Sequence, residues 1–160
     1  MSISQKALEF ENRNIGASGK PTLADAYEIL KEQWSNGDCD REVGLHLMFL
    51  AWYGLIEPEH LTGFFVTEDL RQELNQLLNE VHDYFELQIY KDAEILYVFG
   101  LMAHMFWFML EDNSIWEKRS IEYRQRYRAL APNGIDPEIF RNRGAYGAYY
   151  AGQAKIEGGY

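Results

Sequence analysis

The longest stretch without a charged side chain is ILYVFGLMAHMFWFML, residues 95–110. Apolar groups lie on every face of the helix that it would form, so this helix must be surrounded by protein. We predict a helix from Asp92 to about Glu111 at the centre of the fold. A membrane span is not expected, because the stretch is shorter than the roughly 18–20 apolar residues of a spanning helix and has acids at both ends.

The remaining pattern predicts four more main helices. A second uncharged run, VGLHLMFLAWYGLI at residues 43–56, indicates a helix over about 41–57 that is buried on most faces. Apolar residues at helical spacing indicate amphipathic helices over about 22–36, 67–87 and 114–131. In the last of these, Ser114 and Glu117 form a capping box at the start, and Leu130 ends the buried stripe. The predicted fold class is all-α.

The expected architecture is a bundle of about five main helices around the buried central helix at 95–110, with a short sixth helix near 136–140. These helices define one domain, residues 22–143, and 160 residues is the usual size for one domain. Residues 1–21 form an N-terminal segment that ends in a flexible joint, GASGKP. Residues 144–160 form a tail rich in Gly, Ala and Tyr. The first ten residues lack the basic and apolar regions of a signal peptide.

Charge and cysteine content narrow the function classes. The chain has 25 acidic and 15 basic residues and a formal charge of −10, which disfavours non-specific binding to nucleic acid and favours basic partners. Cys39 is the only cysteine, so no intrachain disulfide can form, and a reduced cytoplasmic location fits. Asp38 and Asp40 should raise the pKa of the Cys39 thiol, which argues against a reactive cysteine.

The helix predicted at 67–87 has an acidic polar face, and Glu73, Glu80 and Asp83 are its candidate partner-binding residues. The helix predicted at 114–131 is instead basic, with arginines among tyrosines, and would suit phosphates or single-stranded RNA. A third interpretation is that both helices carry ordinary solvated charge, or neutralise each other at little gain in stability. The overall negative charge favours the acidic face over the basic helix as a binding surface.

Histidines on three different predicted helices are candidate metal ligands. His46, His82 and His104 could converge in the core of a bundle, with Glu42 one turn before His46 as a fourth ligand or as its hydrogen-bond partner. Such a site would suit zinc or iron. The repeated Glu-x-x-His motif of di-iron bundles is missing, however. The simpler interpretation is that no cofactor binds and that His104 is a neutral core residue.

Other features of the central stretch are more ordinary. Its methionines and aromatic residues are typical of core packing more than of a ligand pocket. Glu111 and Asp112 are an anomaly, because acids are unfavourable at the C-terminus of a helix. A basic neighbour such as Lys118, or a ligand, would offset them.

Two classes of function follow. The first is a protein-interaction module, such as an adaptor, an inhibitor or an immunity-type partner of a basic protein. The alternative is a metal-dependent helical-bundle enzyme or sensor. The first is favoured because no catalytic motif is recognisable, so an enzyme is not the leading interpretation. Two helices as apolar as 41–57 and 92–111 exceed what a domain of this size easily covers, so a homodimer is also predicted.

Overall fold

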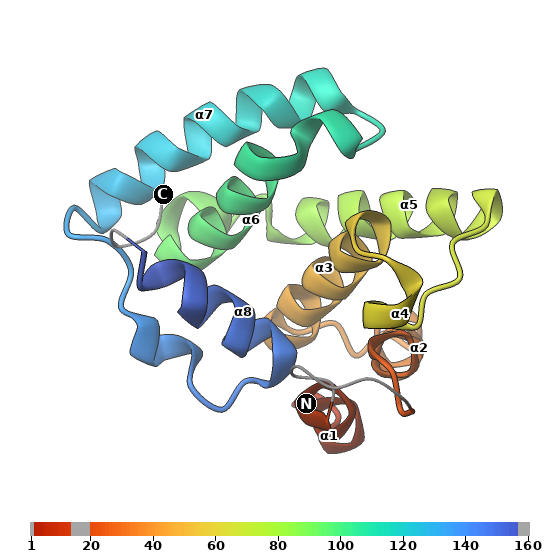
Figure 1. The fold of residues 1–160 in the computed structure, drawn as a ribbon. Helices are drawn as coiled ribbons and strands as arrows, with labels where there is room; N and C mark the ends of the chain where they lie inside the picture. Colours follow the sequence, from red (N-terminus) through yellow and green to blue (C-terminus); the bar gives the residue numbers. More distant parts are fainter. Residues whose placement is uncertain (1, 14–19, 157–160) are drawn as a thin grey trace. The chain divides into compact units, whose positions relative to one another are not determined.

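The computed structural model describes residues 2–13 and 20–156 of the chain. These residues form eight α-helices and three short 3₁₀ helices, and no strand occurs among them (Figure 1). The all-α class is therefore confirmed. The count of five main helices is not, because α1 (Gln5–Arg13), α4 (Glu59–Thr62) and α8 (Gly144–Ala154) add to it. The joint predicted at 16–21 and the end of the tail fall largely outside the described residues.

The chain divides into two compact units, each discontinuous in sequence. Unit 1 contains Met1–His82 and Asn142–Ala148, and unit 2 contains Asp83–Arg141 and Tyr149–Tyr160. The single domain predicted at 22–143 stays a prediction. The first residues of α8 belong to unit 1 and the remainder to unit 2.

Unit 1 is built around α3 (Arg41–Ile56), whose residues from Val43 to Trp52 are all buried. Helix α2 (Leu23–Ser35) packs on α3, and α1 packs on α2. The Asp40 carboxylate caps α3 by accepting a hydrogen bond from the Val43 amide at 2.8 Å. The helix ends at Ile56, two residues before Pro58.

Helix α5 (Glu68–Phe85) buries a stripe of leucines, as its amphipathic pattern predicts. The turn before it is only partly covered. Phe64 is buried, but Leu61 and Phe65 are exposed.

Unit 2 is organised by the packing of α7 (Asn113–Leu130) along α6 (Ala93–Phe106). The buried face of α7 consists of aromatic residues: Trp116 stacks on Phe99 at 6.3 Å between ring centroids, and Tyr127 lies 5.3 Å from Tyr97. The short helices η1 (Ile89–Lys91) and η3 (Pro137–Phe140) complete the unit. Leu130, placed in this stripe by its spacing, is instead 48% exposed.

Helix α6 ends earlier than its apolar pattern predicts, and its predicted position at the centre of the fold stays a prediction. Residues 94–103 of α6 are buried, but α6 stops at Phe106 and a 3₁₀ turn, η2 (Trp107–Met109), follows. His104 is exposed, so its prediction as a core residue is wrong. Phe108 and Met109 are also exposed, which contradicts the expectation that the whole stretch packs in the core.

The early end of α6 removes the anomaly of Glu111 and Asp112. These acids precede α7, and Asp112 is its N-cap residue. Negative charge is favourable at a helix N-terminus. The predicted capping box at Ser114 is wrong, because Ser114 lies inside the helix. None of the described helices is long and apolar enough to cross a membrane.

Candidate functional site

Unit 1 contains a buried cluster of four ionisable side chains. His46, on α3, has each ring nitrogen next to a carboxylate: Nδ1 lies 2.7 Å from Glu11 Oε2, and Nε2 lies 3.1 Å from Glu42 Oε1. The Arg143 guanidinium donates to both Glu42 oxygens, at 2.8 and 2.7 Å. His46 and Glu11 are completely buried, and the Glu42 side chain is 29% exposed. We call these four residues the buried charge cluster.

Three segments far apart in sequence position this cluster. Glu42 and His46 are one helical turn apart on α3, so both side chains lie on the same face. Glu11 comes from α1, and its second oxygen accepts a hydrogen bond from the backbone amide of Tyr146, in the first turn of α8, at 3.2 Å. The Tyr146 ring lies 4.8 Å from the His46 ring and covers it. The cluster therefore links α1, α3 and the start of α8 within unit 1.

Gly144 allows this close approach. Its φ is +65°, in the left-handed region that favours glycine, and a Cβ there would lie 2.7 Å from Glu11 Oε1. A larger residue would displace the Glu11 carboxylate from the Tyr146 amide.

The electrostatics of the cluster favour the charged form of the histidine. Burial alone would lower the pKa of His46, but the Glu11 and Glu42 carboxylates outweigh it and raise the pKa to about 9. Burial would likewise raise the pKa of Glu42, whereas hydrogen bonds from His46 and Arg143 lower it to about 2. At neutral pH the cluster is a chain of alternating charges: carboxylate, imidazolium, carboxylate and guanidinium.

The cluster has the geometry of an internal ionic link rather than that of an exposed acid–base catalyst. His46 and Glu11 have no accessible surface, so a substrate does not reach their polar atoms in this conformation. A histidine with both nitrogens engaged by carboxylates also lacks a nitrogen lone pair directed at a metal. In the ranges that the structure describes, no group of three or more His, Cys, Asp or Glu side chains is arranged to hold a metal ion.

The structure brings together only part of the predicted metal set. His46 and Glu42 are in contact, His82 is buried near the end of α5, and His104 is exposed in unit 2. A zinc or iron site that uses all four stays a prediction. Sequence reasoning missed Glu11 and Arg143, which are 35 and 97 residues from His46 and carry no local signal.

Two of the predicted acidic residues of α5, Glu73 and Glu80, connect α5 to α2 in unit 1. The Tyr27 hydroxyl donates to Glu73 at 3.0 Å, the Lys31 ammonium lies 3.2 Å from Glu73, and the Trp34 indole nitrogen donates to Glu80 at 2.9 Å. Each of the two aromatic donors pairs with an acid 46 residues further along the chain. Helices α2 and α5 therefore run parallel here.

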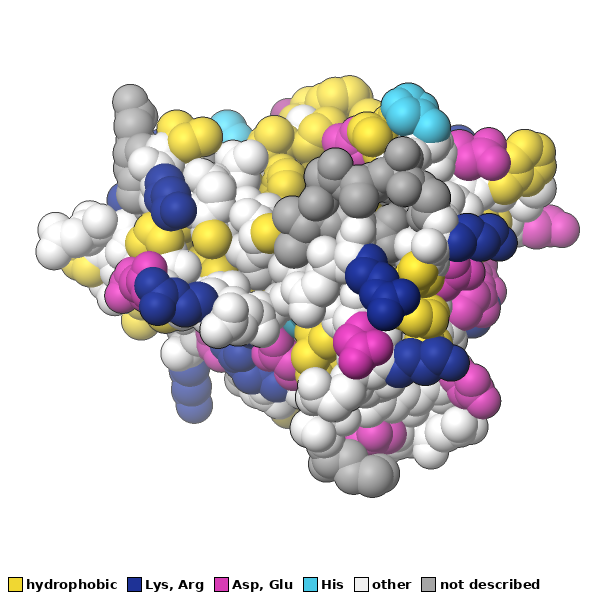
Figure 2. Space-filling model, turned by 60° about the horizontal axis from the view of Figure 1, so that its bottom comes forward, with side chains coloured by type: hydrophobic (Ala, Val, Ile, Leu, Met, Phe, Trp, Pro, Cys, Tyr) yellow, Lys and Arg dark blue, Asp and Glu magenta, His cyan; other side chains and the backbone are white. Residues whose placement is uncertain are grey.

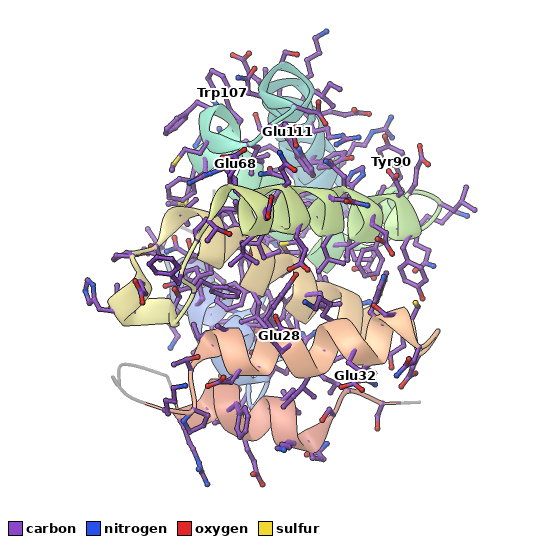
Figure 3. The ribbon with its side chains drawn as sticks, turned by 90° about the vertical axis from the view of Figure 1, so that its right-hand side faces the viewer. Glu28, Glu32, Glu68, Tyr90, Trp107 and Glu111 are labelled. Atoms are coloured by element: carbon purple, nitrogen blue, oxygen red, sulfur yellow. The ribbon has the colours of Figure 1, made fainter. Side chains whose placement is uncertain are left out.

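The same two helices present an acidic surface to solvent. Glu28 is 61% exposed on α2, where it pairs with Lys31, and Glu32 is exposed one turn later. Glu73 remains 42% exposed beside them. Figure 3 looks onto α2 and α5 and labels Glu28 and Glu32. We call Glu28, Glu32, Glu73 and Glu80 the α2–α5 acidic ridge. Asp83, the third predicted residue, is exposed and is the first residue of unit 2.

Two other features of unit 1 contain side chains that are already engaged. An open pocket of about 730 Å³ near the start of α2 is lined by Lys20, His60 and two acids among others, but Thr22 and Asp25 in its wall are engaged in the α2 cap. The Cys39 thiol donates to the Trp34 carbonyl oxygen. Burial and nearby acids, Glu80, Asp38 and Asp40, raise the pKa of this thiol, as its sequence neighbours predict.

Comparison with known proteins identifies no matching family model, no matching curated protein and no matching solved structure.

Proposed function

We propose that the protein is a protein-interaction module that binds a basic partner through the α2–α5 acidic ridge. The observation that carries this proposal is the concentration of four acidic residues on two parallel helices, where Lys31 contacts two of them, Glu28 and Glu73. Complementary charge of this kind accelerates and orients association. On the surface shown in Figure 2, by contrast, acidic and basic side chains are interspersed.

The net charge of −10 supports the same partner class. Adaptors, inhibitors and immunity-type proteins that neutralise a basic protein are the functions that fit. Glu73 and Glu80 remain in the proposed interface, but they also connect α5 to α2. Reversing their charge would therefore perturb the fold as well as binding, and Glu28 and Glu32 are the better positions for a test.

The test is the double variant Glu28→Lys/Glu32→Lys, introduced into the full chain and used to capture partners from its own cells in low salt. Both side chains are exposed, and the Lys31 pair that is lost contributes at most about 1 kcal/mol, so the fold should persist. We expect loss of a basic polypeptide that the original chain retains, and weaker retention by the original chain as salt rises.

The matched control is Glu9→Lys/Glu59→Lys, which changes the net charge equally at exposed acids of unit 1 outside the ridge. Retention of the polypeptide by this control is expected. Equal loss in both variants would show that only net charge matters, and undiminished capture by the ridge variant would reject the proposal. Circular dichroism of both variants checks that the helices remain.

Two further expectations belong to this proposal. We infer a reduced cytoplasmic location from the single cysteine. The homodimer also stays a prediction. It is based on two helices that are too apolar for one domain to cover, and this reason is weaker because α3 and most of α6 are buried within one chain. Asp83 stays a predicted contributor to partner binding.

A further inference from the structure

A second surface, in unit 2, combines apolar and acidic side chains at the turn between α6 and α7. Met105, Phe108, Met109 and Ile115 are 37%, 58%, 41% and 47% exposed, and they lie within eleven residues of one another in sequence. We call these four residues the apolar corner. Exposed apolar side chains that form a patch on a soluble protein mark interaction sites.

Neighbouring elements of unit 2 support the corner. The 3₁₀ turn η2 packs against both α6 and α7, and the Trp107 and Phe108 rings meet edge to face at 5.8 Å. The Met105 sulfur accepts a hydrogen bond from the Tyr149 hydroxyl at 3.9 Å. Methionine side chains adapt to irregular apolar partners, whereas Phe108 supplies a fixed aromatic contact.

Acidic residues are the charged neighbours of the corner in the sequence. From His104 to Glu117 the chain contains Glu111, Asp112 and Glu117 but no lysine or arginine. All three acids are exposed, and Asp112 makes no side-chain capping hydrogen bond to α7. Figure 3 labels Trp107 and Glu111, which lie in the segment between α6 and α7. The next cations are Lys118 and Arg119, and the Arg119 guanidinium lies 4.6 Å from the centre of the Trp116 ring.

This charge distribution indicates which kind of molecule would bind at the apolar corner. A second copy docked here by two-fold symmetry would place Glu111 and Asp112 near the same acids of its partner, which is unfavourable. An anionic lipid surface is repelled for the same reason. An amphipathic helix with an apolar face flanked by lysine or arginine satisfies both the apolar and the acidic groups.

We propose that the apolar corner binds the apolar face of a basic amphipathic helix contributed by another protein. This surface is separate from the α2–α5 acidic ridge, which lies in unit 1 and offers charge without an apolar centre. The two proposals can therefore fail independently.

The probe for this test is a fluorescein-labelled peptide of about 14 residues, roughly four helical turns, composed of Leu and Lys in an amphipathic pattern. Its anisotropy is titrated with the full chain. We expect saturable binding that falls at least about tenfold in Phe108→Ser, because central aromatic contacts dominate such interfaces. Glu111→Gln/Asp112→Asn should weaken binding at low salt and have less effect at high salt.

Controls separate the possible origins of binding. Phe65→Ser removes another exposed aromatic side chain, in unit 1, and should leave peptide binding unchanged. A Leu/Glu peptide of the same pattern, and a Leu/Lys peptide of scrambled order, should bind weakly. Any share of binding that Glu28→Lys/Glu32→Lys removes belongs to the ridge, and the share that Phe108→Ser removes belongs to the corner.

Several results would overturn the proposal. Peptide binding that survives Phe108→Ser, or that is lost only in the ridge variant, would place the peptide elsewhere. A dimer seen by light scattering at high micromolar concentration and dissociated by Phe108→Ser would identify a second copy as the occupant. Flotation with phosphatidylcholine vesicles that depends on Phe108 would identify a membrane surface instead.

Discussion

His46 makes the stability of unit 1 depend on pH. Its pKa is raised to about 9 in the fold, against an ordinary value of 6.5, because two carboxylates stabilise the imidazolium against the cost of burial. A raised pKa means that the folded state binds the proton more tightly than the unfolded chain does. The stabilisation is therefore complete below about pH 6.5 and is lost as the pH rises through about 9.

We expect the free energy of unfolding to fall by an amount on the order of 2–3 kcal/mol between these pH values. Glu11→Gln should move this loss to lower pH, because it removes the charge nearest His46 Nδ1. The measurement is urea unfolding across the pH range, with the imidazole titration followed by NMR. His60→Gln, at an exposed histidine of unit 1, is the control that should leave the profile unchanged. A flat profile would contradict the proposed charge state.

The opposite sign applies at acidic pH. The pKa of Glu42 is lowered to about 2 from an ordinary 4.5, since bonds from His46 and Arg143 outweigh its partial burial. Its contribution is present above about pH 4.5 and is lost as the pH falls through about 2. The cluster therefore stabilises unit 1 most between about pH 4.5 and 6.5.

Gly144→Ala tests how tightly the cluster is assembled. The substitution forces a side chain into a left-handed backbone conformation, at a cost of about 1–2 kcal/mol, and places its Cβ against Glu11. We expect a loss of stability larger than the backbone cost alone. Gly152→Ala in the same helix is the matched control: its Cβ meets nothing within 4 Å, so it should stabilise by about 0.5–1 kcal/mol. A loss in both variants would indicate a general effect on α8.

At the scale of elements, α2 begins with a reciprocal cap that should behave as one unit. The Thr22 hydroxyl accepts from the Asp25 amide at 3.2 Å, and the Asp25 carboxylate accepts from the Thr22 amide at 2.7 Å. The two side chains also bond to each other at 3.1 Å. Thr22→Ala and Asp25→Ala should each cost about 1 kcal/mol.

The double variant Thr22→Ala/Asp25→Ala should cost less than the sum of the two single variants, because they share one hydrogen bond. Shifts of the urea midpoint measure all three values. Thr67→Ala is a comparison at the start of α5, where a threonine also accepts from an amide three residues on. If the stability losses of the two single variants add up to that of the double variant, the reciprocal cap of α2 is not cooperative.

Sequence predicts elements well where an explicit signal marks their ends. Helix α2 starts after a capping threonine, and α3 starts after a capping aspartate and ends before Pro58. The end of α6 has no such signal. Residues 95–110 contain neither proline nor a late glycine, so one continuous helix was the natural prediction. The chain instead leaves the helix at Phe106, with φ −138°, and turns into α7.

At the scale of the whole molecule, the spacing of apolar residues predicts the all-helical class but does not predict the contacts between distant segments. The pairing of Glu42 with His46 follows from their one-turn spacing. Their connection to Glu11 and Arg143 depends on how helices meet, and periodicity does not determine which faces meet. The same is true of the acidic residues of α5. Helical spacing identifies an acidic face, but it does not predict that Tyr27 and Trp34 donate hydrogen bonds to this face.

The order in which the chain is synthesised has a consequence for the buried charge cluster. Glu11 and His46 are made early, but the amide that Glu11 accepts from is at Tyr146, and the cation that pairs with Glu42 is at Arg143. Until the ribosome has released those residues, two carboxylates face one imidazolium without their remaining partners, and burial of such charge is unfavourable. Unit 1 therefore completes its packing late in translation, and until then the face of α3 that carries Glu42 and His46 lacks its cover from the start of α8.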